Sequence, residues 1–158
     1  MTLRIISVVK NRLNKEDIKR NRIGAPKCRW TLDAEEYAKY GDLGLKNAEE
    51  HLDMLAALLK EHHIKLTVAI YPWPYQIYHR DLSSIQVQHW RQWAVKSKTL
   101  LINLFPYFIN DEPWEKVLEE YFIPGDLHWN SRGHALVAEE FLEHWEPAIP
   151  EHAYAATQ

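Results

Sequence analysis

The segment GDLHWNSRGH, residues 125–134, places a carboxylate, two imidazoles and an amide within ten positions. Asp126 and His128 stand two residues apart in it. In a turn or an extended segment, that spacing lets the carboxylate support the imidazole, or lets both side chains enter one cleft. A carboxylate beside a histidine stabilises the cationic ring and fixes its tautomer, as a base that takes a hydroxyl proton requires. A turn residue and a surface imidazole are the alternative interpretation of the same pair.

The elements around this segment favour an α/β fold. Residues 66–71 form a short apolar, β-branched run with little alternation, which is typical of a strand covered on both faces, and Pro72 and Pro74 end it. Asp33 and Asn130 are each placed to cap a helix. The other predicted elements are a strand over 99–105 and helices over 47–62, 85–96, 113–121 and 131–145. The apolar face predicted for the first of these helices holds Leu45, Ala48, Leu52, Leu55, Leu58 and Leu59.

Strand, helix and strand within this span predict a βαβ unit, in which the two strands run parallel. Ligands of open α/β sheets gather at the carboxyl ends of strands and at helix N-termini, where 125–134 is expected to lie. However, only two strands are convincing, whereas a stable sheet with covered faces normally has three or more. The helices predicted here would cover a larger sheet than these strands supply.

The block GDLHWNSRGH resembles the last conserved block of the SGNH (GDSL-type) hydrolase superfamily, in the branch related to alginate O-acetyltransferases. The stretch from TLDAEEYAKYG to IYPWPYQI resembles the long helix and penultimate strand of such proteins, so the likeness covers roughly residues 30–145. It implies a three-layer α/β architecture with a mainly parallel sheet, here lacking its N-terminal strands. It also implies that His128 is the catalytic base and that Asp126 is its partner.

The nucleophile of that superfamily is a serine in a Gly-Asp-Ser motif, which this sequence lacks. The segments that supply the oxyanion hole have no counterpart either. We therefore expect the C-terminal part of an SGNH-like hydrolase that is nearly or wholly inactive by itself, because a triad without its nucleophile keeps only about 10³–10⁴-fold acceleration over water. The implied chemistry is ester hydrolysis or O-acyl (acetyl) transfer on a carbohydrate-like substrate, without metal or organic cofactor. The serines of the sequence are Ser7, Ser83, Ser84, Ser97 and Ser131.

Two further side chains are candidates for substrate binding. Trp73, with Tyr71, follows the strand predicted over 66–71 and could line an acyl or sugar cleft, or could pack in the core. Asn130 could contact substrate or act only as a helix cap.

Two other functions compete with the esterase hypothesis. A metal could be bound by Asp126, His128, His134 and Glu139, although the two histidines lack the i, i+4 spacing of a zinc-binding helix. The chain could instead be a non-catalytic α/β module that binds a carbohydrate or a protein through an aromatic cleft. We predict no metal site and keep the binding module as the alternative.

Composition limits the remaining possibilities. The 158 residues are 46% hydrophobic and 26% charged, which predicts one soluble globular domain. A single cysteine excludes an internal disulfide, and no apolar run approaches the roughly 20 residues of a membrane span. We also expect no signal peptide, although members of the related branch often work outside the cytoplasm.

The net charge of −3 hides a basic beginning, because the first 29 residues hold nine Lys and Arg but two acidic residues. Such a segment could contact nucleic acid or anionic lipid. Because it lacks interleaved aromatic residues, we predict a solvated connector and no nucleic-acid partner. The predicted organisation is a basic segment (1–30), the hydrolase-like domain (31–146) and a tail (147–158).

Overall fold

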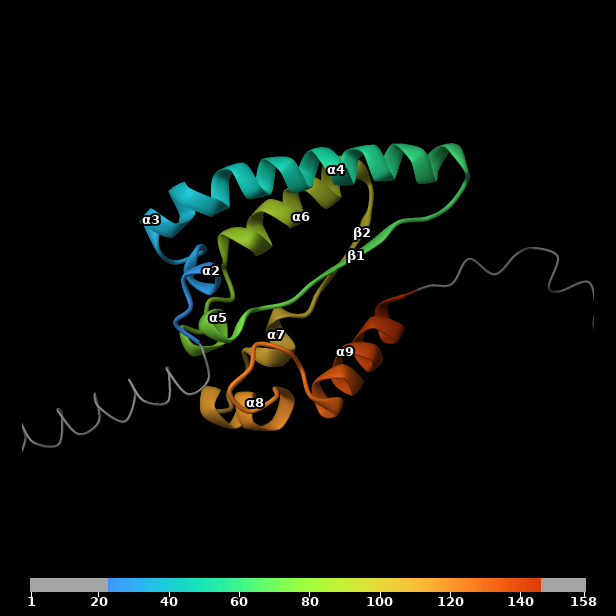
Figure 1. Cartoon of the computed structure of the whole chain (residues 1–158). Helices are drawn as coiled ribbons and strands as arrows, with labels where there is room; N and C mark the ends of the chain where they lie inside the picture. The colour runs from blue at the N-terminus through green and yellow to red at the C-terminus, as the bar shows by residue number, and fades with distance from the viewer. Residues whose placement is uncertain (1–22, 146–158) are drawn as a thin grey trace, which may run out of the picture.

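A computed structural model describes residues 23–145, which are mostly helical (Figure 1). The basic residues 1–22 and the predicted tail lie outside this range. No helix within residues 23–145 has the length and apolarity needed to cross a membrane. In chain order the elements are α2 (Pro26–Arg29), α3 (Ala34–Glu36), the π-helix η1 (Tyr37–Gly41), α4 (Asp42–Glu61), β1 (Thr67–Ile70), α5 (Pro74–Tyr78), α6 (Ile85–Ser97), β2 (Leu100–Asn103), α7 (Phe105–Phe108), α8 (Trp114–Tyr121) and α9 (Ser131–His144).

The predicted three-layer architecture with a mainly parallel sheet is wrong for the described residues. Strands β1 and β2 pair in parallel, from Thr67 with Leu100 to Ile70 with Asn103, and form a sheet of two strands. The predicted strands are therefore confirmed in position and direction, but each is four residues long. A pair this small cannot form the middle layer of a sandwich, and most of the buried hydrophobic residues lie on helices.

The strand predicted over 99–105 is shorter because its last residues begin a helix. Asn103 ends β2, and its side-chain oxygen accepts a hydrogen bond from the backbone N–H of Phe105 at 3.2 Å. Pro106 then occupies the first turn of α7, where its missing N–H costs nothing. A continuous apolar run cannot reveal such a change of structure, because buried strands and buried helices look alike in it.

Helices α4 and α6 run together along one side of the strand pair, whereas α7, α8 and α9 gather on the other (Figure 1). Asp33 caps α3 as predicted, accepting hydrogen bonds from the backbone N–H groups of Glu35 and Glu36. Asp53 on α4 accepts a 2.8 Å hydrogen bond from the Trp93 indole on α6.

The apolar face predicted for α4 is only partly buried. Leu45 is buried, and Leu52 and Leu59 are half-buried. Leu55 and Leu58 are exposed, which corrects the prediction that they face the core. Helix α4 packs against α6, but Leu55 and Leu58 are 40% and 52% exposed, so periodicity alone overestimated the buried length.

A buried glutamine connects three segments that lie far apart in the sequence. The side chain of Gln76, which is fully buried, donates hydrogen bonds to Ser84 at 2.7 Å and to Thr31 at 3.2 Å. Its carbonyl oxygen accepts the backbone N–H of Trp73 at 2.8 Å. Gln76 thereby fixes the start of α5 relative to both the residues after α2 and the start of α6.

We predict that Gln76→Leu lowers the free energy of unfolding by about 1–3 kcal/mol, because its partners lose hydrogen bonds while remaining buried. Gln92→Leu, on the exposed side of α6, is the matched control and should change that free energy by less than about 0.5 kcal/mol. Chemical denaturation measures both. Equal losses in the two variants would contradict a structural role for the Gln76 network.

Candidate functional site

Three of the predicted site residues, Asp126, His128 and Asn130, lie on a tight turn between α8 and α9, whereas Trp73 follows β1. Phe122 and Trp129 form an isolated antiparallel bridge at the base of this turn. The N–H of Asp126 donates to the carbonyl oxygen of Ile123 at 2.9 Å, and Gly125 has a φ of 76°. A proline followed by a glycine at positive φ is the sequence signature of a type II turn, and Pro124 precedes Gly125 here. The local sequence therefore determines the shape of this loop.

Asp126 and His128 are in direct contact. Asp126 Oδ1 lies 2.6 Å from His128 Nδ1, and the same oxygen accepts the backbone N–H groups of Leu127 at 2.6 Å and His128 at 3.3 Å. The hydrogen bond with the His128 ring, followed by those backbone bonds, lowers the pKa of the Asp126 carboxyl below its ordinary value. The His128 side chain is 83% exposed and that of Asp126 42%. The pair predicted from the sequence is thus formed, and it faces solvent.

Trp129 attaches this exposed loop to the core. Its ring stacks on Phe108 with centroids 6.0 Å apart and lies 4.4 Å from the ring of Tyr71. His134 contacts the same indole edge-on, with ring centroids 5.5 Å apart. An aromatic residue next to His128 in the chain therefore holds the loop against the carboxyl end of β1.

A cleft of about 110 Å³ lies between this loop and the chain that follows β1. Trp73 and His128 both line it, so the structure brings together two of the residues that the sequence singled out. Asp126 contacts His128 but does not line the cleft. The lining is mainly apolar and aromatic, with one basic side chain: Lys27, Tyr71, Pro72, Trp73, Leu127 and His128.

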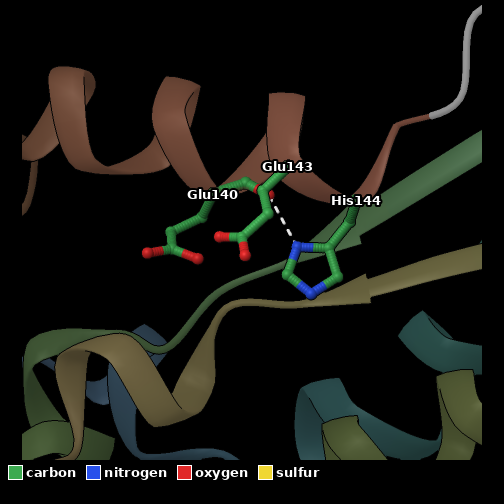
Figure 2. Close-up of side chains that lie close together, drawn as sticks. All are labelled: Glu140, Glu143 and His144. Carbon is green, nitrogen blue, oxygen red and sulfur yellow. Dashed lines mark hydrogen bonds between the residues drawn. The ribbon is translucent and has the colours of Figure 1, made fainter.

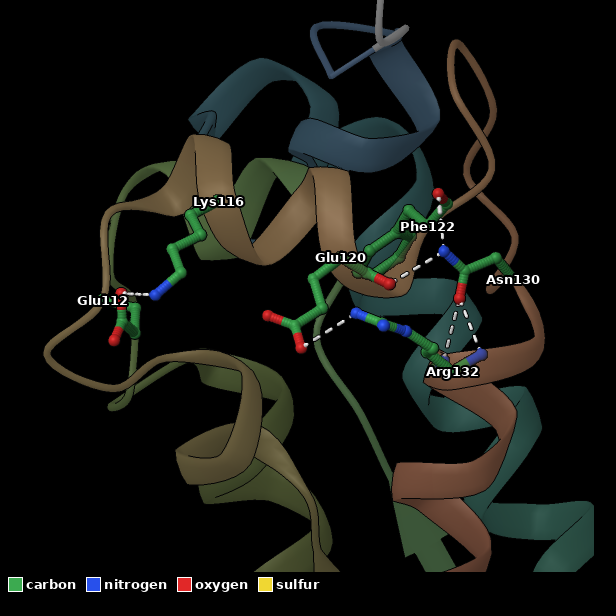
Figure 3. A network of polar contacts seen from close by, with 7 residues as sticks. Glu112, Lys116, Glu120, Phe122, Asn130 and Arg132 are labelled. Carbon is green, nitrogen blue, oxygen red and sulfur yellow. Dashed lines mark hydrogen bonds and ion pairs between the residues drawn. The ribbon is translucent and has the colours of Figure 1, made fainter.

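Asn130 lies outside the cleft and connects α8 to α9 (Figure 3). Its side-chain oxygen accepts the N–H groups of Arg132 and Gly133 at 2.9 and 3.0 Å, which confirms the predicted cap. Its amide nitrogen donates to the carbonyl oxygens of Glu120 at 2.8 Å and Phe122 at 3.2 Å. With four hydrogen bonds inside the protein, Asn130 shapes the loop, and its predicted contact with substrate stays a prediction.

Among the described residues, the possible metal ligands that gather are Glu140, Glu143 and His144, on the last turns of α9 (Figure 2). His144 Nδ1 contacts the backbone oxygen of Glu140 at 2.8 Å. The set considered from the sequence (Asp126, His128, His134 and Glu139) is not brought together as such a group. Solvated acidic side chains at a helix end are common without an ion.

Sequence reasoning missed Lys27, which enters the cleft from α2. No motif surrounds this lysine, and its place beside His128 depends on the packing of α2 against α5. It also missed Leu127, although its position between the two predicted catalytic residues was a usable signal. Contacts between distant segments leave no spacing pattern in a single sequence, so Lys27 could not have been found that way.

Comparison with known proteins adds no assignment: no family model matches the chain, and neither a curated protein nor a solved structure is significantly similar to it.

A glycine at the start of α9 allows the two helices around the loop to approach closely. A Cβ on Gly133 would overlap the backbone oxygen of Tyr121 and lie 2.8 Å from Cβ of Trp129. We expect Gly133→Ala to lower the free energy of unfolding by about 1–3 kcal/mol, because α9 must shift away from α8. Gly44→Ala is the control, since its Cβ would meet nothing within 4 Å in the interior of α4. Thermal and chemical unfolding should show that it stabilises the protein by about 0.5–1 kcal/mol.

The contact between Asp126 and His128 has a direct signature in an NMR titration. The folded pKa of Asp126 is lowered, so its interactions are present at neutral pH and are lost as the pH falls through that lowered value. We expect the carboxyl to titrate below the ordinary 3.8 in the wild type and to move part of the way back in His128→Gln. The return is partial because the backbone N–H groups remain. An unchanged midpoint in the variant would show that the side-chain pair does not persist in solution.

Proposed function

We propose that Asp126 and His128 are the general-base pair of a site for ester hydrolysis or O-acyl transfer on a carbohydrate-like substrate. The observation that carries this proposal is the 2.6 Å contact between the two side chains at the edge of an aromatic cleft. The resemblance of GDLHWNSRGH to the last block of SGNH hydrolases supports it. The described fold does not, because its sheet has two strands instead of the three-layer architecture that the resemblance implies.

The geometry suits proton transfer at the second ring nitrogen of His128. When Nδ1 donates its hydrogen to Asp126, the lone pair of the neutral ring is on Nε2. Within the described part of the chain, no hydrogen bond involves Nε2 of His128, so it is available to a hydroxyl group that enters the cleft. The carboxylate would then stabilise the imidazolium formed by the transfer.

The reacting hydroxyl is supplied from outside residues 23–145 in this proposal. The described serines do not contact His128 through a hydrogen bond, and Ser84 and Ser97 instead bond to Gln76 and Thr99. A hydroxyl of the substrate, of another polypeptide or of the undescribed part of the chain could fill this role. The described residues would then provide a base and a binding surface, but only a small part of the full rate acceleration.

The cleft suits a small acyl group attached to a larger molecule. Its volume of about 110 Å³ is well below the roughly 300–1,000 Å³ of pockets that enclose whole ligands. Tyr71 and Trp73 offer aromatic surface at its edge, where the flat face of a sugar can pack. The carbohydrate-like part of the substrate would therefore lie on the open side, with the ester directed toward His128.

We predict slow hydrolysis of 4-nitrophenyl acetate by the chain alone, with a His128-dependent component. His128→Gln should lower this rate at least about threefold, and Asp126→Asn should lower it less, because the ring remains but loses its support. His62→Gln, which removes an exposed imidazole at the end of α4, is the matched control and should leave the rate nearly unchanged. The reaction is followed by release of nitrophenolate across a range of pH.

Three results would count against the proposal. Equal losses in His62→Gln and His128→Gln would mean that the histidines act only as solvent-exposed imidazoles. Rapid turnover that survives His128→Gln would place the chemistry elsewhere. Saturable binding of an acetylated glycan without any His128-dependent ester cleavage would favour a non-catalytic binding module, because the open aromatic cleft serves that function without a base.

A further inference from the structure

Lys27 lines the same small cleft as His128, although the two residues belong to opposite ends of the described chain. Lys27 lies on α2, which contacts α5, the helix that begins after Trp73. The base and the lysine therefore border a single space that holds a few non-hydrogen atoms. A reacting group placed against Nε2 of His128 therefore lies in the same cleft as the Lys27 side chain.

Helix α2 carries two basic residues, Lys27 and Arg29, which differ in their ion pairs. Arg29 pairs with Glu36 at 3.3 Å and with Asp33 at 4.0 Å, so carboxylates compensate its charge. Among the ion pairs of residues 23–145, none includes Lys27. Asp126 directs Oδ1 into three hydrogen bonds within its own loop. Among the residues that line the cleft, Lys27 therefore carries the positive charge that can attract an incoming anion.

We propose that Lys27 is a further catalytic residue, which stabilises the oxyanion formed during acyl transfer. This rests on the proposed function. A hydroxyl oxygen attacks the carbonyl carbon of the ester, its proton passes to Nε2 of His128, and the carbonyl π electrons move onto the oxygen that faces the Lys27 ammonium. When the C=O bond reforms, the bond to the alcohol oxygen breaks, and the alcohol takes the proton back from His128.

Lys27 is itself exposed, and Pro72 and Leu127 supply apolar surface in the lining of the same cleft. A charge that develops in such a space is stabilised more strongly by a nearby cation than it would be in bulk water. The long stem of lysine lets the ammonium approach the oxygen without movement of α2.

The test uses two tetrahedral probes of similar size and different charge. Methanesulfonate carries the negative oxygens of the oxyanion, and dimethyl sulfone is its neutral counterpart. The whole chain is titrated with each probe at constant ionic strength, and NMR shifts of the Trp73 indole and the His128 ring report binding in the cleft. Three variants are compared with the wild type: Lys27→Gln, Lys27→Arg and, as a matched loss of an exposed lysine on α4, Lys46→Gln.

We expect Lys27→Gln to raise the Kd for methanesulfonate about threefold to fivefold, the upper range for an exposed charge pair. Lys27→Arg should stay within about twofold of the wild type, and Lys46→Gln should have no effect. Binding of dimethyl sulfone should be the same in all four proteins. This pattern would support a specific anion contact at Lys27.

Three outcomes would overturn it: no shift of Trp73 or His128 with methanesulfonate, equal weakening by Lys27→Gln and Lys46→Gln, or equal weakening of both probes by Lys27→Gln. Failure of the proposed function is detected separately, because it is measured by the His128 dependence of ester cleavage. The methanesulfonate titration needs no turnover, so failure of the anion contact at Lys27 can be distinguished from failure of the proposed function.

Discussion

The candidate site depends first on the side-chain amide of Asn130. Its oxygen satisfies two N–H groups at the start of α9, and its nitrogen bonds to two carbonyl oxygens at the end of α8. These four hydrogen bonds fix both ends of the loop that carries Asp126 and His128. Because those two side chains face water, little other packing holds them, and the closed loop is what keeps the carboxylate beside the ring.

A second polar network holds the opposite wall of the cleft. Gln76 is buried, and its hydrogen bonds connect Trp73 with Thr31 and Ser84. A buried amide with all its partners satisfied restricts the arrangement of the segments that it joins, because any shift leaves a polar group without water or a partner. The two walls are therefore fixed by separate amides, and Trp129, packed against Tyr71 and Phe108, joins them. The two walls of the cleft are therefore held in place, whereas the His128 side chain remains open to solvent.

Much of the secondary structure was predictable, whereas the architecture was not. The strands around Ile70 and Ile102 and the parallel pairing were found where the sequence placed them. The three-layer sheet was not, because a likeness confined to a loop, a helix and a strand carries no information on how many strands lie beside them. Leu55 and Leu58 show a related limit: an apolar periodic face predicts a helix, but burial requires a neighbour that the helix pattern does not reveal.

Spacing along the chain is sufficient to set the interactions that are made within a few residues. The contact of Asp126 with His128, the cap at Asn130 and the turn at Gly125 all follow from spacing and backbone preference, since these residues are neighbours in any fold. The packing of distant segments, in contrast, places Trp73 in a cleft with His128 and brings Lys27 to the same cleft. Those arrangements depend on how α2, α5 and α9 pack, and packing between distant segments is set by the whole chain rather than by any local pattern.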